Sequence, residues 1–374
     1  MKKILFLTGT RADYGKIKSL MKEVEKNPKF ELHIFVTGMH MLSKYGSTFR
    51  EIEKDGFKNI YYFINQQSEA KMDLTLSNTI MGVSNYVHEL KPDLIVVHGD
   101  RLEALAGSIV GSFNNIRVAH IEGGEVSGTI DESIRHAITK FAHIHLVSNE
   151  RAKQRVIQLG ENEKDIHVIG SPDIDIMLSD NLPTIEKVKR RYEIPFNEYA
   201  ILIYHPVTTE LNSIEKNVNS LVNAVIKSEK NYVVIYPNND EGNQFIFNEY
   251  KRFESKKNFK VFPSMRFEYF LTLLKHSSFM IGNSSAGVRE TEIYGIPAID
   301  IGNRQKGRYE IQVDSNILHV KEEEYSILKA ISLIEGKRAT YNNFGNGQSH
   351  VKFLELLEEK IWNGEIQKHF VDSF

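Results

Sequence analysis

Short runs of apolar, often β-branched residues alternate with amphipathic stretches along nearly the whole chain. The apolar runs lie at residues 4–7, 32–36, 94–97, 118–121, 144–147, 200–204, 233–236, 279–281 and 298–301. The stretches with helical spacing lie at residues 19–25, 74–90, 103–113, 132–141, 213–228, 267–275 and 323–334. Several runs are apolar on both faces, which suits parallel strands covered by helices on each side. We therefore predict an α/β fold of βαβ units with doubly wound parallel sheets.

The strand rhythm breaks once, between about residues 173 and 199. A chain of 374 residues is long enough for two domains of similar size. We therefore predict two Rossmann-like domains, at residues 1–175 and 190–350, and expect the tail at 353–374 to pack back on the first domain. Ligands of such domains bind beyond the carboxyl ends of the strands, so the residues that follow each strand are the candidates for function.

Composition excludes several classes of protein. Forty-seven Lys and Arg against 49 Asp and Glu leave a net charge of −2, without the basic surplus of a general nucleic-acid binder. The absence of cysteine excludes disulfide scaffolds, thiolate nucleophiles and Cys-ligated metal sites. The first apolar run ends at Thr8, too early for an export signal, and no run has the roughly 18 apolar residues of a membrane span. We expect a soluble protein of the cytoplasm.

The turn after the first strand looks like a phosphate loop but lacks its spacing. Five residues separate Gly9 from Gly15, and Ile17 follows Lys16 where a phosphate loop has Ser or Thr. A glycine turn that leads into a helix still offers backbone N–H groups to an anion, with Arg11 and Lys16 nearby. The alternative is an ordinary strand-to-helix turn with solvated cations.

Acids and histidines follow two neighbouring strands of the first half. His98 and Asp100 come at the end of one, and His120 and Glu122 at the end of the next. Because residues two apart in an extended chain point the same way, we expect His98 to face with Asp100 and His120 with Glu122.

Three interpretations apply to these acids. Two histidines with two carboxylates suit a metal, but no metal-specific spacing is present. Glu125 and Glu132 fit a structural role, as a solvated loop acid and a helix-capping residue. Asp100, Glu122 and Asp131 fit catalysis, in which burial and crowding separate their pKa values into acid and base roles. We favour catalysis for these three and predict no metal.

The second half carries groups that suit a nucleotide. Pro206 ends a strand just after His205, which leaves the ring at a ligand-binding edge. The segment 282–290 runs from a strand through small polar residues, including Ser284 and Ser285, into a helix start that suits phosphate. Glu290, one to two turns into that helix, suits ribose hydroxyls or an intrahelical partner. Arg304 lies in a basic loop that suits a diphosphate or is a solvated turn.

The whole set of motifs resembles the hydrolysing UDP-N-acetylglucosamine 2-epimerases. The resemblance is carried, in chain order, by residues 8–14, 98–101, 120–125, 127–131, 133–136, 205–209 and 282–290. It implies a glycosyltransferase-B-like fold with two Rossmann-like domains facing across a cleft. It also implies conversion of UDP-N-acetylglucosamine and water to N-acetylmannosamine and UDP, the first step of sialic-acid synthesis for bacterial capsule polysaccharide.

The choice of the hydrolysing branch depends on the residues after Arg11. Non-hydrolysing relatives have Arg-Pro-Glu after the first Gly-Thr, whereas in this chain Arg11 is followed by Ala12-Asp13. Two positions depart from the family pattern: Glu132 stands where Asp is common, and Gly15 stands where some members have Ser. These departures place in question a proton-transfer role for position 132 and one hydroxyl contact to the ligand.

The resemblance implies a role for each candidate residue. Asp100, Glu122 and Asp131 form the acid–base set and His205 assists the leaving group. The substrate-binding residues are Arg11, Lys16 and Arg101 in the first domain and Ser284, Ser285, Glu290 and Arg304 in the second. The scheme needs no metal or other cofactor, and the resemblance suggests a homodimer or homotetramer.

Three alternatives remain open. The same chemistry on UDP-2,4-diacetamido-2,4,6-trideoxyglucose would serve a legionaminic-type pathway. A glycosyltransferase of the same fold would share the nucleotide seat but leave the acid cluster unexplained. A nucleotide-sugar sensor would share everything except turnover.

Overall fold

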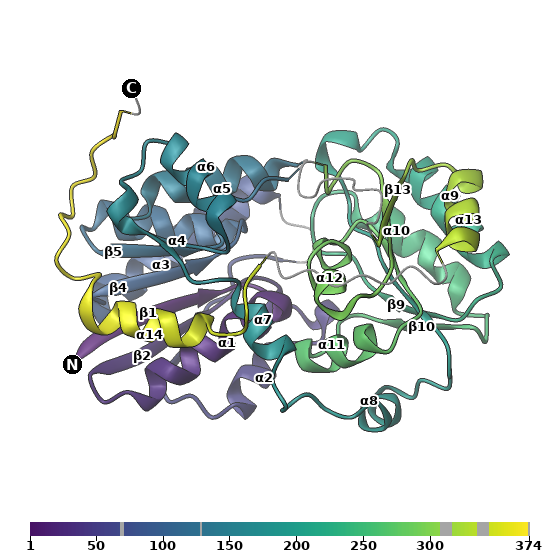
Figure 1. Ribbon diagram of the computed structural model, residues 1–374, viewed down its shortest axis with the longest axis horizontal. Helices are drawn as coiled ribbons and strands as arrows, with labels where there is room; N and C mark the ends of the chain where they lie inside the picture. Colours follow the sequence, from purple (N-terminus) through teal and green to yellow (C-terminus); the bar gives the residue numbers. More distant parts are fainter. Residues whose placement is uncertain (68–70, 128, 307–315, 335–343, 373–374) are drawn as a thin grey trace. The chain divides into compact units, whose positions relative to one another are not determined.

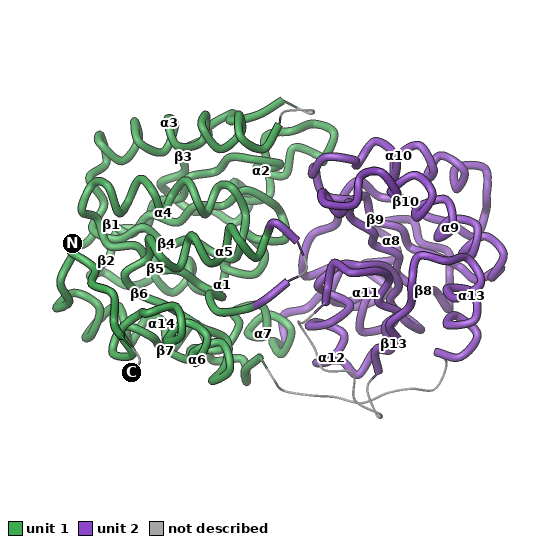
Figure 2. The backbone as a smooth tube through the Cα atoms, turned by 90° about the horizontal axis from the view of Figure 1, so that it is seen from above, with its two compact units in different colours: residues 1–125, 131–179, 343–374 green, residues 126–130, 180–342 purple. Residues whose placement is uncertain are grey.

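The computed structural model describes residues 1–67, 71–127, 129–306, 316–334 and 344–372. The chain forms two compact units, drawn in different colours in Figure 2. Unit 1 comprises Met1–Glu125, Asp131–Ser179 and Asn343–Phe374, and unit 2 comprises Val126–Ile130 and Asp180–Asn342. Among the described residues, no helix is both long and apolar enough to cross a membrane.

The described part of unit 1 contains a seven-stranded parallel sheet in the order β3-β2-β1-β4-β5-β6-β7. Figure 1 labels β1, β2, β4 and β5 of this sheet. Its strands are β1 (Lys2–Thr8), β2 (Phe30–Val36), β3 (Ile60–Tyr62), β4 (Leu94–His98), β5 (Arg117–Ile121), β6 (Ile144–Val147) and β7 (Ile166–Val168). Its helices are α1 (Arg11–Lys26), α2 (Phe49–Lys54), α3 (Met72–Leu90), α4 (Leu102–Phe113), α5 (Ile130–Phe141), α6 (Glu150–Gln158), α7 (Pro172–Met177) and α14 (Ser349–Glu359).

The apolar runs are apolar on both faces because each face of the sheet has its own core. On β1, Ile4 and Phe6 join a cluster that includes residues of α1 and α14. Leu5 and Leu7, which point the other way, join a second cluster with residues of α3, α4 and α5. Helices therefore cover both faces, as the strand sequences predict.

The described part of unit 2 repeats the plan with a six-stranded parallel sheet in the order β10-β9-β8-β11-β12-β13. Its strands are β8 (Ala200–Ile203), β9 (Tyr232–Ile235), β10 (Phe259–Phe262), β11 (Met280–Gly282), β12 (Ala298–Ile301) and β13 (Ile317–Val320). Its helices are α8 (Ile185–Tyr192), α9 (Ile214–Lys227), α10 (Asn243–Tyr250), α11 (Phe267–Lys275), α12 (Glu290–Tyr294) and α13 (Glu324–Leu333).

The predicted α/β class with parallel sheets is confirmed, and each predicted strand is present with ends within two residues. Sequence periodicity missed β3, β10 and β13 and gave no separate strand for β7, because these are short edge strands with polar or half-exposed side chains. The first helix begins at Arg11 rather than near residue 19, because the Thr10 hydroxyl accepts a hydrogen bond from the Asp13 N–H (3.1 Å). Asp13 and Lys16 therefore lie within a helix.

Each sheet has one point where its strand order reverses. In unit 1 this point lies between β1 and β4, and in unit 2 between β8 and β11. The connections on the two sides leave toward opposite faces, so the carboxyl ends of these strands are the expected places for a ligand.

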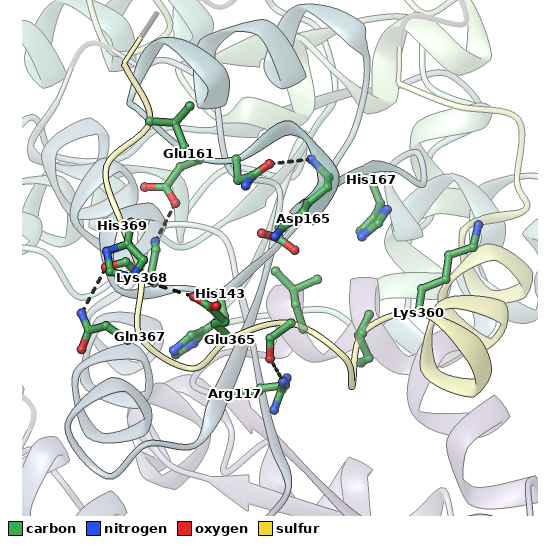
Figure 3. Close-up of a pocket in the computed structure, with 16 residues that line it drawn as sticks. Arg117, His143, Glu161, Asp165, His167, Lys360, Glu365, Gln367, Lys368 and His369 are labelled. Carbon is green, nitrogen blue, oxygen red and sulfur yellow. Dashed lines mark hydrogen bonds and ion pairs between the residues drawn. The ribbon is translucent and has the colours of Figure 1, made fainter.

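The chain after α14 runs along the amino edge of the unit 1 sheet, opposite the carboxyl edge. The Lys368 ammonium donates hydrogen bonds to the carbonyls of Thr139, Lys140 and Ala142 at the end of α5, and it lies 2.7 Å from the Glu161 carboxylate. A cavity of about 200 Å³ lies beside this segment. Figure 3 shows Glu161, His143 and Lys368 around it.

We expect Lys368→Met to destabilise unit 1 by about 1–2 kcal/mol, because a cation at a helix C-terminus offsets the partial negative charge of the last carbonyls. Urea denaturation measures the loss, and hydrogen exchange of residues 130–141 reports whether α5 frays. Lys360→Met is the matched control, since Lys360 is exposed in the same segment. Equal effects of the two substitutions would contradict the capping role.

Candidate active site

The carboxyl edge of the unit 1 sheet begins where β4 and β5 end, and the backbone there is not extended. Gly99 has a φ of 73° and Glu122 a φ of 64°. A left-handed φ is unusual for a residue with a side chain and marks Glu122 as a position held by its surroundings. The chain turns at Gly99, so His98 and Asp100 do not pair as predicted. Nor do His120 and Glu122, because His120 contacts Thr139 and the Gly99 carbonyl, whereas Glu122 contacts Ser171 and His98.

His98 instead lies between two carboxylates. Its Nδ1 is 2.7 Å from Asp13 Oδ1, and its Nε2 is 3.3 Å from Glu122 Oε2. Burial by itself lowers the pKa of His98, but the carboxylates of Glu122 and Asp13 outweigh burial and raise it to about 10. His120 is also buried, and burial lowers its pKa to about 3, although the Gly99 carbonyl 2.8 Å from its Nε2 acts in the opposite direction. The edge therefore holds one charged and one neutral imidazole.

Arg135 of α5 gathers a second set of acids. Its guanidinium is 2% exposed. It donates hydrogen bonds to Asp100, to Glu125 at 3.4 Å and to the Glu122 carbonyl at 3.3 Å. A buried cation of this kind needs several acceptors, and here two of the acceptors are carboxylates. Arg135 lies in the motif at residues 133–136, but the sequence by itself did not indicate a role for it.

Of the other acids at this edge, two are buried and one is partly exposed. Asp131 lies buried in the first turn of α5, while Glu132 is turned toward His136 at 3.6 Å. Glu125 is buried and accepts a hydrogen bond from the Ser148 hydroxyl at 2.9 Å. The expectation that Glu125 is a solvated loop acid is therefore wrong, because Arg135 and Ser148 hold it inside unit 1.

The three predicted cations of unit 1 differ in their surroundings. Arg11 forms an ion pair with Glu51 of α2. Lys16 is buried, 3.0 Å from Asp173 of α7. Arg101 directly precedes α4. Their role in binding a diphosphate stays a prediction.

In unit 2, Asn283 joins the ends of β8 and β11. Its Oδ1 accepts a hydrogen bond from the His205 N–H at 2.7 Å, and its Nδ2 donates one to the His205 carbonyl at 2.9 Å. The His205 ring accepts a hydrogen bond at Nδ1 from the Asn238 N–H at 3.0 Å, so a neutral ring carries its proton on Nε2. The side chain of Asn283 thus continues the strand pairing and holds His205 at the ligand-binding edge.

The end of β11 also shapes the segment 282–290, which is predicted to bind phosphate. Gly282 has a φ of 133°, and a Cβ there would lie 1.8 Å from the Ile203 carbonyl oxygen, so only glycine fits between β8 and β11. The Ser284 hydroxyl accepts from the Ala286 N–H at 3.4 Å, and a 3₁₀ turn follows at Ser285–Gly287. Both serines remain partly exposed.

Two further predicted residues flank this segment. Arg304 donates a hydrogen bond to the Asn283 carbonyl at 3.3 Å, which ties the basic loop to the end of β11. Glu290 is 2% exposed and is the first residue of α12. Its predicted place one to two turns into a helix is wrong, because the residues before it form a 3₁₀ turn. Within the described ranges, no group of three or more acids and histidines is arranged to hold a metal ion.

Comparison with known proteins identifies a single family. The family model for UDP-N-acetylglucosamine 2-epimerase matches residues 22–358. The chain is 46% identical over 378 residues to UDP-N-acetylglucosamine 2-epimerase of Neisseria meningitidis serogroup B, covering all of this chain and 99% of that protein.

Two further relatives carry more specific names. UDP-N,N'-diacetylbacillosamine 2-epimerase (hydrolyzing) of Legionella pneumophila is 31% identical, with 96% of each chain covered. Polysialic acid biosynthesis protein P7 of Escherichia coli is 33% identical, with 90% of this chain and 87% of that protein covered.

The fold matches solved structures as well. A crystal structure of Methanocaldococcus jannaschii UDP-GlcNAc 2-epimerase in complex with UDP-GlcNAc and UDP has a TM-score of 0.83, with 22% identity, 96% of this chain and 99% of that chain covered. The chain therefore has the glycosyltransferase-B-like fold that its motifs imply.

We expect Asn283→Ala to destabilise unit 2 by about 1–3 kcal/mol, because two partly buried backbone groups of His205 lose their partner. Thermal unfolding measures the loss, and calorimetry with UDP reports whether the edge still binds a nucleotide. Asn231→Ala is the control, since its amide makes one exposed hydrogen bond, to the Glu198 carbonyl. A variant as stable as the control would contradict the bridging role.

Three buried histidines of unit 1 predict sensitivity to acid. Burial lowers the pKa of His40 and His143 to about 4 and that of His120 to about 3. Below the ordinary pKa of about 6.5 the unfolded chain binds protons that the native chain does not, so stability falls by up to about 1.4 kcal/mol per pH unit for each histidine. His98, whose native pKa is raised, keeps its contribution throughout this range.

Urea midpoints measured at pH 7, 6, 5 and 4 check this prediction. We expect a progressive decrease below pH 6.5, at a constant ionic strength. A midpoint that stays constant down to pH 4 would show that these rings are protonated in the native protein.

Proposed function

Because the chain belongs to the UDP-N-acetylglucosamine 2-epimerase family, we propose that it converts UDP-N-acetylglucosamine and water to N-acetylmannosamine and UDP. The observation that carries this proposal is the buried set of carboxylates and cations at the carboxyl edge of the unit 1 sheet. A transferase that only moves a sugar to an acceptor has no need for this many acids beside a histidine.

The reaction has two steps in this scheme. In the first, the C1–O bond breaks and its electron pair leaves with UDP, while a carboxylate takes the C2 proton and the C2–H electrons form a C1=C2 bond. In the second, the oxygen of water bonds to C1, the water loses a proton, and a carboxylic acid returns a proton to C2 from the other face. The sum consumes one water and inverts C2.

Unit 1 supplies the acid–base set in this proposal. Positive charge develops on the sugar ring as the C1–O bond breaks, because the C2–H bond is only weakly acidic, and carboxylates stabilise such a cation. Asp100 and Glu122 are suited to this role because Arg135 and His98 beside them favour their ionised forms. Asp131, buried at the start of α5, is the third member of the set.

Unit 2 supplies the nucleotide seat. Ser284 and Ser285 donate hydrogen bonds to the phosphates, Arg304 offsets their charge, and Glu290 accepts the ribose hydroxyls. His205, held by Asn283 and carrying its proton on Nε2, assists the departing diphosphate. Arg11, Lys16 and Arg101 contribute positive charge from unit 1.

The hydrolytic outcome and the pathway are parts of the proposal. The Legionella relative is named a hydrolyzing enzyme, and the Escherichia coli relative takes part in polysialic acid biosynthesis. Both support release of a free 2-epimer as the first step of sialic-acid synthesis. The same Legionella relative favours a second candidate substrate, UDP-2,4-diacetamido-2,4,6-trideoxyglucose, with unchanged chemistry. We further propose a cytoplasmic homodimer or homotetramer that acts without a metal or other cofactor.

Incubation with UDP-N-acetylglucosamine in deuterated water tests the proposal by proton NMR. We expect UDP and N-acetylmannosamine with deuterium at C2, because the C2 proton is exchanged with solvent between the two steps. Release of UDP with a sugar that keeps its glucose configuration and its C2 proton would contradict it. Consumption of the diacetamido substrate alone would assign the second candidate.

We expect Asp100→Asn, Glu122→Gln and Asp131→Asn each to lower kcat by about 10²–10⁴-fold, which is the usual contribution of a general acid or base. Asp73→Asn, at an exposed position of α3, is the matched control. A variant of the three that keeps full activity would remove that residue from the acid–base set.

A further inference from the structure

His98 is a buried group to which the family resemblance gives no role of its own, and the scheme above uses it only as a neighbour of Glu122. It is the last residue of β4 and is 9% exposed. Its two ring nitrogens point at carboxylates from two other elements, Asp13 of α1 and Glu122 after β5. The three side chains come together only at the carboxyl edge of the sheet.

The geometry determines the protonation of the ring. A neutral imidazole has one N–H and one acceptor nitrogen, so it would turn an unshared pair toward one of the two carboxylates. Only the doubly protonated ring donates a hydrogen bond to Asp13 at 2.7 Å and also places positive charge, rather than an unshared pair, 3.3 Å from the Glu122 carboxylate. The neighbouring titratable group on β5, His120, stays neutral because burial lowers its pKa to about 3.

Each carboxylate also accepts a hydrogen bond at the oxygen that does not face His98. The Gly9 N–H lies 3.3 Å from Asp13 Oδ2, and the Ser171 hydroxyl donates a hydrogen bond to Glu122 Oε1. Glu122 is therefore held between a hydroxyl donor and the imidazole. Its left-handed backbone, with a φ of 64°, directs the side chain into this position.

We propose that His98 is a positioning residue, held as an imidazolium between Asp13 and Glu122, that keeps Glu122 an oriented carboxylate ready to accept the C2 proton. This inference rests on the proposed function, because it assigns Glu122 the part of the proton acceptor.

The physical need for such a group comes from burial. Glu122 is 4% exposed. Removal from water favours the neutral form of a carboxyl group, which cannot accept a proton, whereas an adjacent cation favours the ionised form. The cation makes Glu122 a weaker base, but it makes the basic form the one that is present at neutral pH.

The charge of His98 is measured directly on the unmodified protein. With ¹⁵N-labelled histidine, ring nitrogen shifts distinguish an imidazolium from a neutral tautomer, and a His98→Gln spectrum assigns the resonance among the 14 histidines of the chain. We expect two protonated ring nitrogens at pH 8. A neutral ring at that pH would overturn the proposal, whatever the enzyme's activity.

The pH dependence of kcat separates a positioning role from a structural one. His98→Gln keeps an amide near Glu122 but removes the positive charge, so Glu122 becomes easier to protonate. We expect the acidic limb of the profile to move to higher pH by about one pH unit or more, with at least a tenfold lower kcat at pH 7 and little change in KM. A lower kcat with an unmoved limb would overturn the proposal.

His88→Gln is the control, because His88 is exposed on α3. It should leave both the limb and kcat unchanged. Failure of the proposed function is recognised separately: a wild-type protein that releases no UDP from its candidate substrates would contradict that function, while the ring nitrogen shifts would still decide the charge of His98.

Discussion

The parallel pairing of β1 with β4, and of β8 with β11, is the constraint on which the placement of the candidate residues depends. At these points the connections leave toward opposite faces, so the carboxyl ends of the strands stay open to a ligand. The first pairing places His98, the last residue of β4, and the second places Asn283, which comes directly after β11. The close approach of β11 to β8 is possible only because Gly282 has no side chain. A change in strand order would separate these residues even if their local sequences stayed the same.

Charge neutralisation is the second constraint, and it acts mainly in unit 1. Buried ions are costly unless each has a partner, so the fold pairs Arg135 with Asp100 and Glu125, Lys16 with Asp173, and His98 with Asp13 and Glu122. These pairs do more than satisfy the interior. They also lie beside the carboxylates to which we assign acid and base roles, so the proposed chemistry and the stability of unit 1 depend on the same contacts.

Much of the fold is readable from the sequence, whereas the organisation of the site is readable only in part. Strand positions follow from local apolar periodicity, and the short strands β3, β7, β10 and β13 escape it because edge strands bury little surface. Asp100, Glu122 and His205 are recognisable because they follow strands, and Asp131 because it lies in a motif at a helix start. The residues that position them are not recognisable in this way. His98 appears in the sequence only as a histidine at a strand end, and Asn283 only as part of a polar segment. For Asp13, the indication in the sequence is its place in the motif at residues 8–14, which contributes to the family resemblance.

The α/β class and the family are readable from the sequence alone, since the first depends on patterns within a few residues and the second on motifs in chain order. The pairing of polar and charged groups that are distant in the sequence is visible only in the three-dimensional structure. Asp13 and His98 are 85 positions apart, His205 and Asn283 are 78 apart, and Lys16 and Asp173 are 157 apart. Periodicity carries no information about such pairs, because strand order and positive φ values, not local spacing, bring their side chains together.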